Sequence, residues 1–292
     1  MHSIFQPKPT VTEEEFRQAF RWLQREVALT AIAGTVIGAG SGILIAYALA
    51  LGANNVHIGL LAAIPFISAL LQLPTVLLVE RYRLRKLIAV TSWLASRLVW
   101  FPVALIPLWL PVPGRQAVDV MIGLVAVSYL LIAITNTAWS SWMKDLVPSR
   151  ILGSYFASRF SLATLAAAIS GLVFSFFAER WRSFAPGQPA INGYVIVFGV
   201  AAVVSVLDIM AVLPVPEPAM VRPSNGARSI TRSILEPYSR PQSRTLALFL
   251  FFWGLASNLA TPFFAVYMLV GLKFALTTVM MLTILSQMVI VV

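Results

Sequence analysis

Residues 118–139 read VDVMIGLVAVSYLLIAITNTAW, a stretch in which Asp119 is the only charged side chain. A helix needs ~20 predominantly apolar residues to cross the hydrocarbon core of a bilayer, and this stretch has that length. Runs of the same character recur along the chain at 27–52, 55–79, 87–110, 157–178, 194–213, 245–271 and 274–292. The sequence therefore predicts an all-α polytopic membrane protein with eight crossings.

The overall composition excludes an ordinary soluble domain. Of the 292 residues, 59% are hydrophobic and only 11% are charged, whereas the surface of a soluble protein needs far more charge. A bilayer removes this conflict, because lipid solvates apolar side chains while each helix satisfies its own backbone hydrogen bonds. We therefore expect the lipid bilayer to be a partner of this chain.

The basic residues, which give a net charge of +10, lie mostly on one side of the expected crossings. That side carries Lys8, Arg17, Arg21, Arg25, Arg81, Arg83, Arg85, Lys86, Lys144, Arg150, Arg159, Arg222, Arg228, Arg232, Arg240 and Arg244. The opposite side carries only Arg115, Arg180, Arg182 and Lys273. This imbalance predicts a cytoplasmic N-terminus in the plasma membrane, which is the inner membrane if the cell is bacterial. The basic clusters lack the interleaved aromatic residues of a nucleic-acid platform, so no nucleic-acid partner is expected.

Residues of the types that carry catalysis or bind metals are scarce. The chain has no cysteine, and its two histidines, His2 and His57, lie far apart. The sequence shows no paired acids near a membrane face, no activated nucleophile and no nucleotide-binding loop. We therefore expect no catalytic residues, no metal site and no cofactor, and the protein is not predicted to be an enzyme.

The chain divides into four predicted parts. Residues 1–26 form a cytoplasmic amphipathic arm, and residues 27–213 form a six-helix transmembrane bundle. Residues 214–244 form a cytoplasmic linker rich in Pro and Arg, which cannot span a membrane. Residues 245–292 begin a second transmembrane bundle. We expect this second bundle to be incomplete, because the chain stops inside an apolar run.

Two crossings share a short pattern that indicates a repeat. The Tyr-x-Leu pattern of Tyr47 and Leu49 recurs at Tyr267 and Leu269, and each pattern is followed by a short turn and another apolar run. Six crossings, a basic linker and a restart in the same orientation are what a parallel repeat of two bundles predicts.

Two loop motifs resemble those of the major facilitator superfamily of secondary transporters. Residues 76–86, VLLVERYRLRK, retain the acid, the following Arg and the basic end of the family's Gly-x-x-x-Asp-Arg-x-Gly-Arg-Lys loop, but both glycines are absent. Residues 139–150, WSSWMKDLVPSR, resemble the fourth-to-fifth loop of some bacterial members. The resemblance implies a twelve-helix fold, of which this chain covers two thirds, and a small-molecule substrate moved by alternating access. A coupling ion such as H+ is one option.

Two charged residues lie inside expected crossings. Arg97 lies ~15 Å along the third crossing at 1.5 Å per residue, where an unpaired arginine costs at least ~2.5 kcal/mol. Asp208 is the clearest carboxylate within a crossing. The family places the third and sixth helices side by side, away from the central cavity, so we favour a structural Arg97–Asp208 pair. Proton coupling by Asp208, substrate contact by Arg97 and snorkelling remain open alternatives.

Polar side chains on the helices that line the family's central cavity are candidates for substrate contact. They are Tyr47, Gln72, Tyr129, Asn136, Asn258, Tyr267 and Gln287. Amide groups can bond a substrate or a neighbouring helix, so helix packing is the plainer reading of each. The first crossing also carries small residues at every fourth position from Gly34 to Ala50, which suit either static packing or sliding between bundles.

Charged residues in the predicted cytoplasmic loops are candidates for a gate. They are Glu80, Arg81, Arg85, Asp145 and Arg150. As in the family, they are expected to form charge links that favour one gate state, since even ~1 kcal/mol biases a balanced equilibrium. Topology-setting charge is the plainer reading.

The function expected from this sequence is secondary active transport of a small molecule. A non-transporting sensor or assembly protein on the same fold is the alternative, and a membrane-embedded enzyme is a weaker one.

Overall fold

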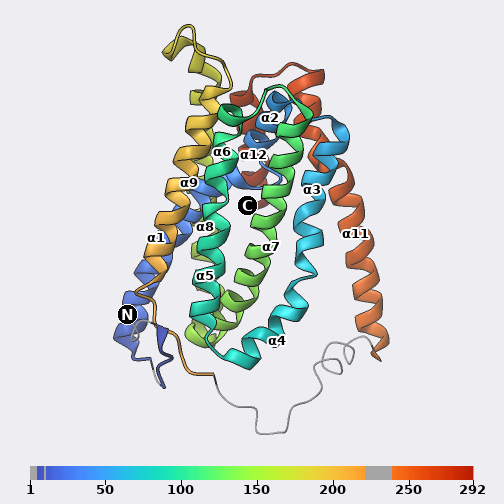
Figure 1. Cartoon of the computed structure of the whole chain (residues 1–292). Coiled ribbons are helices and arrows are strands. Elements are labelled where there is room, and N and C mark those ends of the chain that lie inside the picture. Colours follow the sequence, from blue (N-terminus) through green and yellow to red (C-terminus); the bar gives the residue numbers. More distant parts are fainter. Residues whose placement is uncertain (1–4, 10, 221–238, 292) are drawn as a thin grey trace.

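The computed structural model describes residues 5–9, 11–220 and 239–291. Over these residues the chain consists of long helices packed lengthwise against one another, joined by short connections (Figure 1). A single parallel β-bridge joins Lys8 to Pro218. The prediction of an all-helical architecture is confirmed for the described residues.

The helical elements follow one another along the chain in a simple order. They are α1 (Glu13–Ile37), α2 (Gly42–Leu51), α3 (Asn55–Ala69), α4 (Gln72–Tyr82), α5 (Arg85–Leu98), α6 (Trp100–Trp109), α7 (Arg115–Leu146), η2 (Ser149–Ile151), α8 (Leu152–Phe184), α9 (Asn192–Val212), α11 (Pro241–Val266), η4 (Tyr267–Gly271) and α12 (Leu276–Val291).

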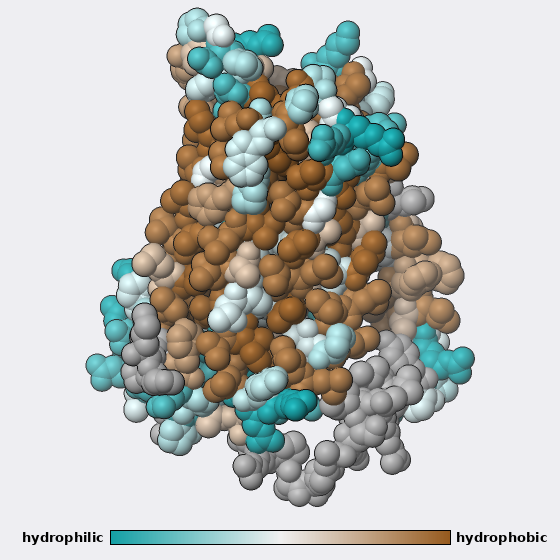
Figure 2. All heavy atoms as spheres, viewed as in Figure 1, coloured by the Kyte–Doolittle hydropathy of each residue, from teal (hydrophilic) through white to brown (hydrophobic). Residues whose placement is uncertain are grey.

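The described residues contain seven helical segments that are long and apolar enough to cross a membrane. They are Glu13–Leu51, Asn55–Tyr82, Arg85–Trp109, Arg115–Leu146, Ser149–Phe184, Asn192–Val212 and Pro241–Gly271. Figure 2 shows the matching surface, with a broad apolar belt between polar side chains at the two ends of the molecule. This architecture is consistent with a multi-pass membrane protein.

The eighth predicted crossing differs from the other seven. The sequence predicts a crossing over 274–292, whereas α12 has 16 residues and falls short of the ~20 that a spanning helix needs. The helix packs against α8 and α2, so it belongs to the bundle although it is short.

The first crossing also departs from its predicted boundaries. The sequence predicts a cytoplasmic amphipathic arm over 1–26 that leads into the first crossing at 27–52, and α1 runs without interruption from Glu13 into the bundle, so part of the predicted arm lies inside it. The helix begins at Glu13 because the Thr12 hydroxyl accepts the Glu15 N–H while the Glu15 carboxylate accepts the Thr12 N–H. Ala19 and Leu23 are buried, so this part of α1 packs as tightly as a core helix.

Three crossings are interrupted within their length. Pro74 lies four residues after Leu70, where α3 gives way to α4, and Pro102 lies four residues after Leu98, where α5 gives way to α6. A proline cannot donate to the carbonyl four residues earlier and its ring crowds that carbonyl, so both interruptions have a local cause. The first crossing is interrupted at Gly38, and Ser41 begins α2 by accepting the N–H groups of Ile43 and Leu44.

The helices surround an apolar interior that consists of one large cluster and two smaller ones. α1 packs between α8 and α9, while α5 packs along α7 and against α9. α11 differs, because its large apolar side chains from Leu246 to Leu255 are all more than half exposed. It lies at the edge of the molecule beside α3 (Figure 1). The core that positions the candidate site is therefore built mainly by α1 to α9, to which α12 adds Leu276 and Met280.

Candidate functional site

A cavity of about 320 Å³ lies inside the bundle, between α1 and α5 to α8. We call it the bundle cavity. Its lining residues are Glu26, Thr30, Gly34, Ile37, Gly38, Trp93, Ser96, Arg97, Trp100, Ser128, Tyr129, Ile132, Thr135, Asn136, Trp139 and Arg159. Charged, hydroxyl-bearing and indole side chains thus meet in the interior of helices that are otherwise apolar.

Two buried ion pairs adjoin the bundle cavity. Arg97 Nη2 on α5 lies 3.0 Å from Asp208 Oδ2 on α9, and Arg159 Nη1 on α8 lies 2.8 Å from Glu26 Oε2 on α1. Both carboxylates are buried, with Asp208 completely removed from solvent. The structure thus brings Arg97 and Asp208 together, as the sequence predicts. It also gives Arg97 a place in the cavity wall, which the expected position of the third helix did not foresee.

A threonine hydroxyl joins the two ion pairs. Thr30 Oγ1 lies 2.9 Å from Asp208 Oδ2 and 3.1 Å from Glu26 Oε1. Two arginines and two carboxylates, from α1, α5, α8 and α9, therefore form one connected group whose formal charges cancel. Removing one member of such a group leaves a buried charge uncompensated and typically costs ~3–5 kcal/mol.

The remaining walls of the bundle cavity are aromatic and hydroxyl-bearing. The Trp100 Nε1–H donates to Ser128 Oγ at 3.0 Å, and the Ser96 and Ser128 hydroxyls are 2.8 Å apart. Arg97 Cζ lies 5.7 Å from the Trp93 ring centroid, and Arg159 Cζ lies 5.6 Å from that of Trp139. Both guanidinium groups therefore lie against indole faces as well as carboxylates.

Tyr129 connects the cavity wall to the interruption of the first crossing. Its hydroxyl accepts the Ala39 N–H at 2.6 Å, just where α1 has ended and α2 has not begun. The backbone group that the interruption leaves unpaired is thereby satisfied, as a buried break requires. Asn136 lies two turns further along α7 and also lines the cavity. Of the predicted substrate contacts, these two are the ones that the structure places in this cavity.

The other five predicted substrate contacts lie elsewhere. Tyr47 is fully buried among core side chains, where its hydroxyl donates to Val103 O at 2.9 Å and its ring packs on Phe198. Asn258 Nδ2 donates to Gly254 O at 2.8 Å within its own helix, and Tyr267 is 61% exposed. Gln72 begins α4, outside the cavity walls, and Gln287 lines a separate groove. The polar residues of different crossings therefore do not converge as the family layout implied, because helix rotation decides where each points.

Sequence reasoning missed Glu26, Thr30 and Arg159 as parts of a site. Glu26 was assigned to the cytoplasmic arm and Arg159 to the loop charges, so neither was expected inside the bundle. A usable signal was present, because Glu26 and Thr30 are four residues apart and so occupy one face of a helix that continues from the arm. The continuity of α1 is what turns this face inward.

A second hollow, of about 470 Å³, lies between α1, α8 and α12. We call it the glycine groove, since Gly34, Gly38, Gly40 and Gly42 line it together with alanine side chains of α8 and with Met280 and Gln287 of α12. A Cβ atom at Gly171 would come within 2.7 Å of Met280 Cε, so α8 and α12 are in close contact there, and a larger residue would require the end of the Met280 side chain to shift. Gly34 and Gly38 belong to the walls of both the glycine groove and the bundle cavity.

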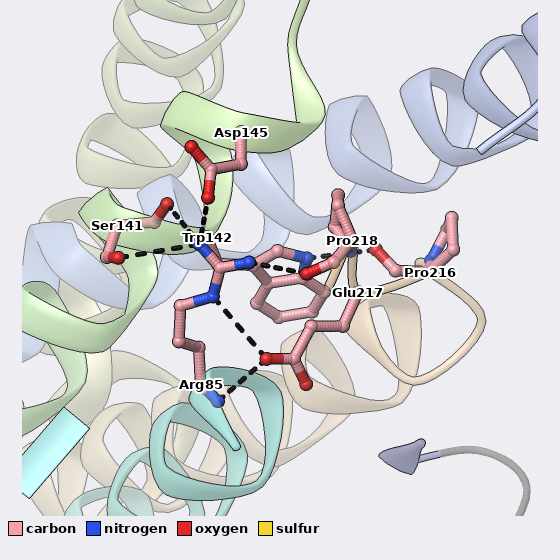
Figure 3. Close-up of polar contacts among 7 residues, drawn as sticks. All are labelled: Arg85, Ser141, Trp142, Asp145, Pro216, Glu217 and Pro218. Carbon is pink, nitrogen blue, oxygen red and sulfur yellow. Dashed lines mark hydrogen bonds and ion pairs between the residues drawn. The ribbon is translucent and has the colours of Figure 1, made fainter. Parts of the chain in front are cut away.

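At one end of the bundle, Arg85 is the centre of a dense polar cluster (Figure 3). Its Nη1 donates to Asp145 Oδ2 at 2.5 Å and to Ser141 O at 2.9 Å, and its Nη2 donates to Pro218 O at 2.5 Å. Its backbone N–H donates to Glu217 Oε1 at 2.8 Å, and its Nε lies 3.5 Å from the same oxygen. We call these residues the Arg85 cluster and this end of the bundle the linker end.

The segment after α9 is held against the linker end by several further contacts. Lys86 Nζ donates to Leu213 O and Val215 O, and Trp142 Nε1 donates to Pro216 O. Lys8 and Ala219 complete the docking: Lys8 N donates to Glu217 O, and Ala219 N donates to Lys8 O. The beginning of the predicted linker is therefore docked on the bundle, because Val215 and Glu217 are buried there. Residues 221–238 of that predicted linker lie outside the described residues.

Burial raises the pKa of the Glu217 carboxyl above its ordinary value. The backbone N–H groups of Arg85 and Lys86 and the Arg85 guanidinium oppose part of this rise. Glu217 therefore binds a proton more readily in the docked segment than in water.

The predicted gate charges are only partly brought together. Arg85 and Asp145 form an ion pair at the linker end. Glu80, Arg81 and Arg150 are exposed, and the ion pairs among the described residues do not include them. Arg81 instead lies over the Tyr82 ring at 5.8 Å. The partner of Arg85 that the sequence did not indicate is Glu217.

No family model matches this chain, and no curated protein or solved structure matches it either. Within the described part of the chain, no group of three or more histidine or acidic side chains is arranged to hold a metal ion. The site must therefore be interpreted from its own chemistry, which is that of a cavity between membrane-length helices, lined by charged, hydroxyl-bearing and aromatic side chains.

Proposed function

We propose that this chain is a secondary active transporter of the major facilitator type, which moves a small molecule across a membrane by alternating access. The observation that carries the proposal is the bundle cavity, whose walls carry three charged side chains and several hydroxyl groups inside helices long and apolar enough to span a bilayer, with Asp208 paired to one of the three. Ionisable groups at such depth are costly and generally serve solute or ion pathways.

The interruption of the first crossing supports this proposal. Discontinuous helices near the middle of a bundle are a recurring feature of transporter binding sites, because irregular backbone is tolerated only where it is buried in protein or lines a cavity. Here the break at Gly38 borders both the bundle cavity and the glycine groove. In the proposal the bundle cavity holds the solute and the glycine groove is the surface along which α12 moves.

The Arg85 cluster is the proposed gate at the linker end. It ties α5, α7 and the segment after α9 together through charge-assisted hydrogen bonds. In the proposal this end is cytoplasmic, the gate is closed in the described conformation, and its opening admits solute from that side. A coupling ion such as H+ belongs to the same proposal.

Accessibility of the cavity from both sides of the membrane tests the proposal without knowledge of the solute. The chain has no cysteine, so Asn136→Cys gives the bundle cavity a single thiol. In alternating access, an impermeant maleimide added to vesicles of either orientation labels this thiol, because each conformation opens the cavity to one side. A sensor or a structural cavity gives labelling from one side at most.

Two surface positions provide matched controls. Ser149 begins η2 at the start of the α8 span, and Ser183 lies near the far end of α8, and both are exposed. Ser149→Cys and Ser183→Cys should each react from one side only, and from opposite sides. If Asn136→Cys reacts only from the side that labels one control, alternating access is refuted.

A further inference from the structure

Two buried N–H donors of the bundle cavity have no acceptor. Trp93 Nε1 and Arg97 Nε are both without a hydrogen-bond partner, and the side chains are 5% and 7% exposed. Both residues line the bundle cavity. They are four residues apart on α5, so they occupy the same face of one helix. Buried donors are satisfied in most proteins, so two neighbouring exceptions, both on residues that line a cavity, point to a ligand that supplies the acceptor.

Other indole groups of the chain show that the unpaired state of Trp93 is not general. The indole N–H of Trp100 donates to Ser128 Oγ, that of Trp142 to Pro216 O and that of Trp181 to Pro189 O. Buried tryptophans usually find such a partner. Trp181 has a paired indole N–H and lies outside the bundle cavity, so it is the reference for Trp93.

The charge of the cavity restricts what the ligand can be. Arg97 is neutralised by Asp208 and Arg159 by Glu26, with Thr30 between the two carboxylates. An anion or a cation added to this balanced group would be an uncompensated charge in a medium of low dielectric constant. An uncharged ligand avoids that cost.

The shape of the walls adds a preference for a flat apolar ring. Trp93, Trp100 and Trp139 all line the cavity, and the arginines lie against the indoles of Trp93 and Trp139. Aromatic pairs gain from stacked and edge-to-face arrangements beyond the area that they bury. A ring-bearing solute therefore has both an apolar surface to contact and, beside it, two donors.

We propose that the bundle cavity binds an uncharged aromatic solute bearing a carbonyl-type oxygen, which accepts hydrogen bonds from Trp93 Nε1–H and Arg97 Nε–H. This names the substrate class of the proposed transporter and, as a statement about transport, rests on that proposed function. The binding itself does not require transport.

A set of three probes of similar size tests the charge and acceptor requirement. Benzamide, benzoate and benzylamine share one ring and differ in net charge at neutral pH. Each is titrated into the purified full chain in detergent, and binding is followed by isothermal titration calorimetry. We expect benzamide to bind, with benzoate and benzylammonium at least tenfold weaker. Equal or tighter binding of either charged probe overturns the proposal.

A pair of tryptophan variants tests the donor. Trp93→Phe keeps an aromatic ring and removes the unpaired N–H, so benzamide affinity should fall about tenfold, the value of roughly one hydrogen bond. Trp181→Phe removes an N–H that Pro189 O already accepts, at a position outside the bundle cavity, so the affinity should change less than threefold. Equal losses in the two variants contradict the proposed contact. Size-exclusion profiles identify a variant that fails to fold. In that case the comparison of the three probes on the wild-type chain decides whether the cavity prefers the uncharged solute.

The outcomes separate this inference from the proposed function. If Asn136→Cys is labelled from both sides but benzamide does not bind at millimolar concentrations, the proposed transport is retained and the proposed class of solute is overturned. Benzamide binding that depends on Trp93, with one-sided labelling of Asn136→Cys, supports the binding site and overturns transport.

Discussion

Arg97 in the bundle cavity and Arg85 at the linker end are both buried arginines paired with carboxylates, but their donors are used differently. Each of the three guanidinium nitrogens of Arg85 has an acceptor, supplied by Ser141, Asp145, Glu217 and Pro218. Arg97 has Asp208 as its carboxylate, while its buried Nε–H is unpaired and the residue lines a cavity. A saturated guanidinium holds segments together, whereas an unsaturated one retains the capacity to bind a ligand. The count of satisfied donors therefore distinguishes a structural arginine from one at a binding site.

The largest effect in this comparison is expected when Arg97 loses its partner, the carboxylate of Asp208. In Asp208→Ala the guanidinium is left buried without its counter-charge, and we expect a loss of about 3–5 kcal/mol of stability. The thermal midpoint of the detergent-solubilised chain measures it. Asp119→Ala removes an exposed carboxylate and should change stability by less than about 1 kcal/mol.

The double variant sharpens the same test. Removing both charges leaves no uncompensated group, so Arg97→Ala combined with Asp208→Ala should recover part of what either single variant loses. A double variant no more stable than the single ones shows that the two residues do not act as a pair.

The linker end should respond to a change of donor geometry. Arg85→Lys keeps the positive charge but cannot reproduce the divergent contacts with Asp145, Glu217 and Pro218. We expect a loss of about 1–3 kcal/mol and faster labelling of Asn136→Cys from the linker end, because the proposed gate is weakened. Lys144→Arg, at an exposed position, is the control and should leave the labelling rate unchanged. An unchanged rate in Arg85→Lys as well removes the cluster from the gate.

A smaller effect is expected where the two ion pairs of the cavity are joined. Thr30→Val removes the hydroxyl between Glu26 and Asp208 with little change in shape, and it should cost about 1–2 kcal/mol. Thr164 donates only to Phe160 O of its own helix, so Thr164→Val should cost less than about 0.5 kcal/mol. Equal thermal midpoints for the two variants refute a connected group.

The smallest effect is a change in pH dependence at the linker end. Because the pKa of Glu217 is raised in the folded state, the folded chain binds its proton more readily than the unfolded chain. The contribution of this carboxyl to stability is therefore largest in acid and declines as the pH rises from the ordinary value through the raised one. Glu217→Gln should remove that decline, which thermal midpoints measured across the acid range reveal. If the thermal midpoints of Glu217→Gln and wild type change in parallel with pH, the raised pKa of Glu217 is contradicted.

The crossings were predictable because hydropathy alone decides whether a segment can lie in lipid. The Arg97–Asp208 pair was predictable for a related reason, since an unpaired charge inside a crossing is costly and few partners were available. Glu26 was not found, because its burial depends on α1 continuing from the arm into the bundle. How each helix is rotated is set by packing between segments, and the separation of Tyr47 from Asn136 follows from that packing.

The first crossing becomes a partition one backbone thick where Gly34 and Gly38 face the bundle cavity on one side and the glycine groove on the other. At these two glycines no side chain lies between the main chain and either cavity. A ligand that contacts this part of the first crossing from the bundle cavity would contact main-chain atoms directly. Met280 of α12 lines the glycine groove on the other side of the same main chain. A ligand in the bundle cavity and the residues of the glycine groove are therefore separated at this point by the main chain of the first crossing.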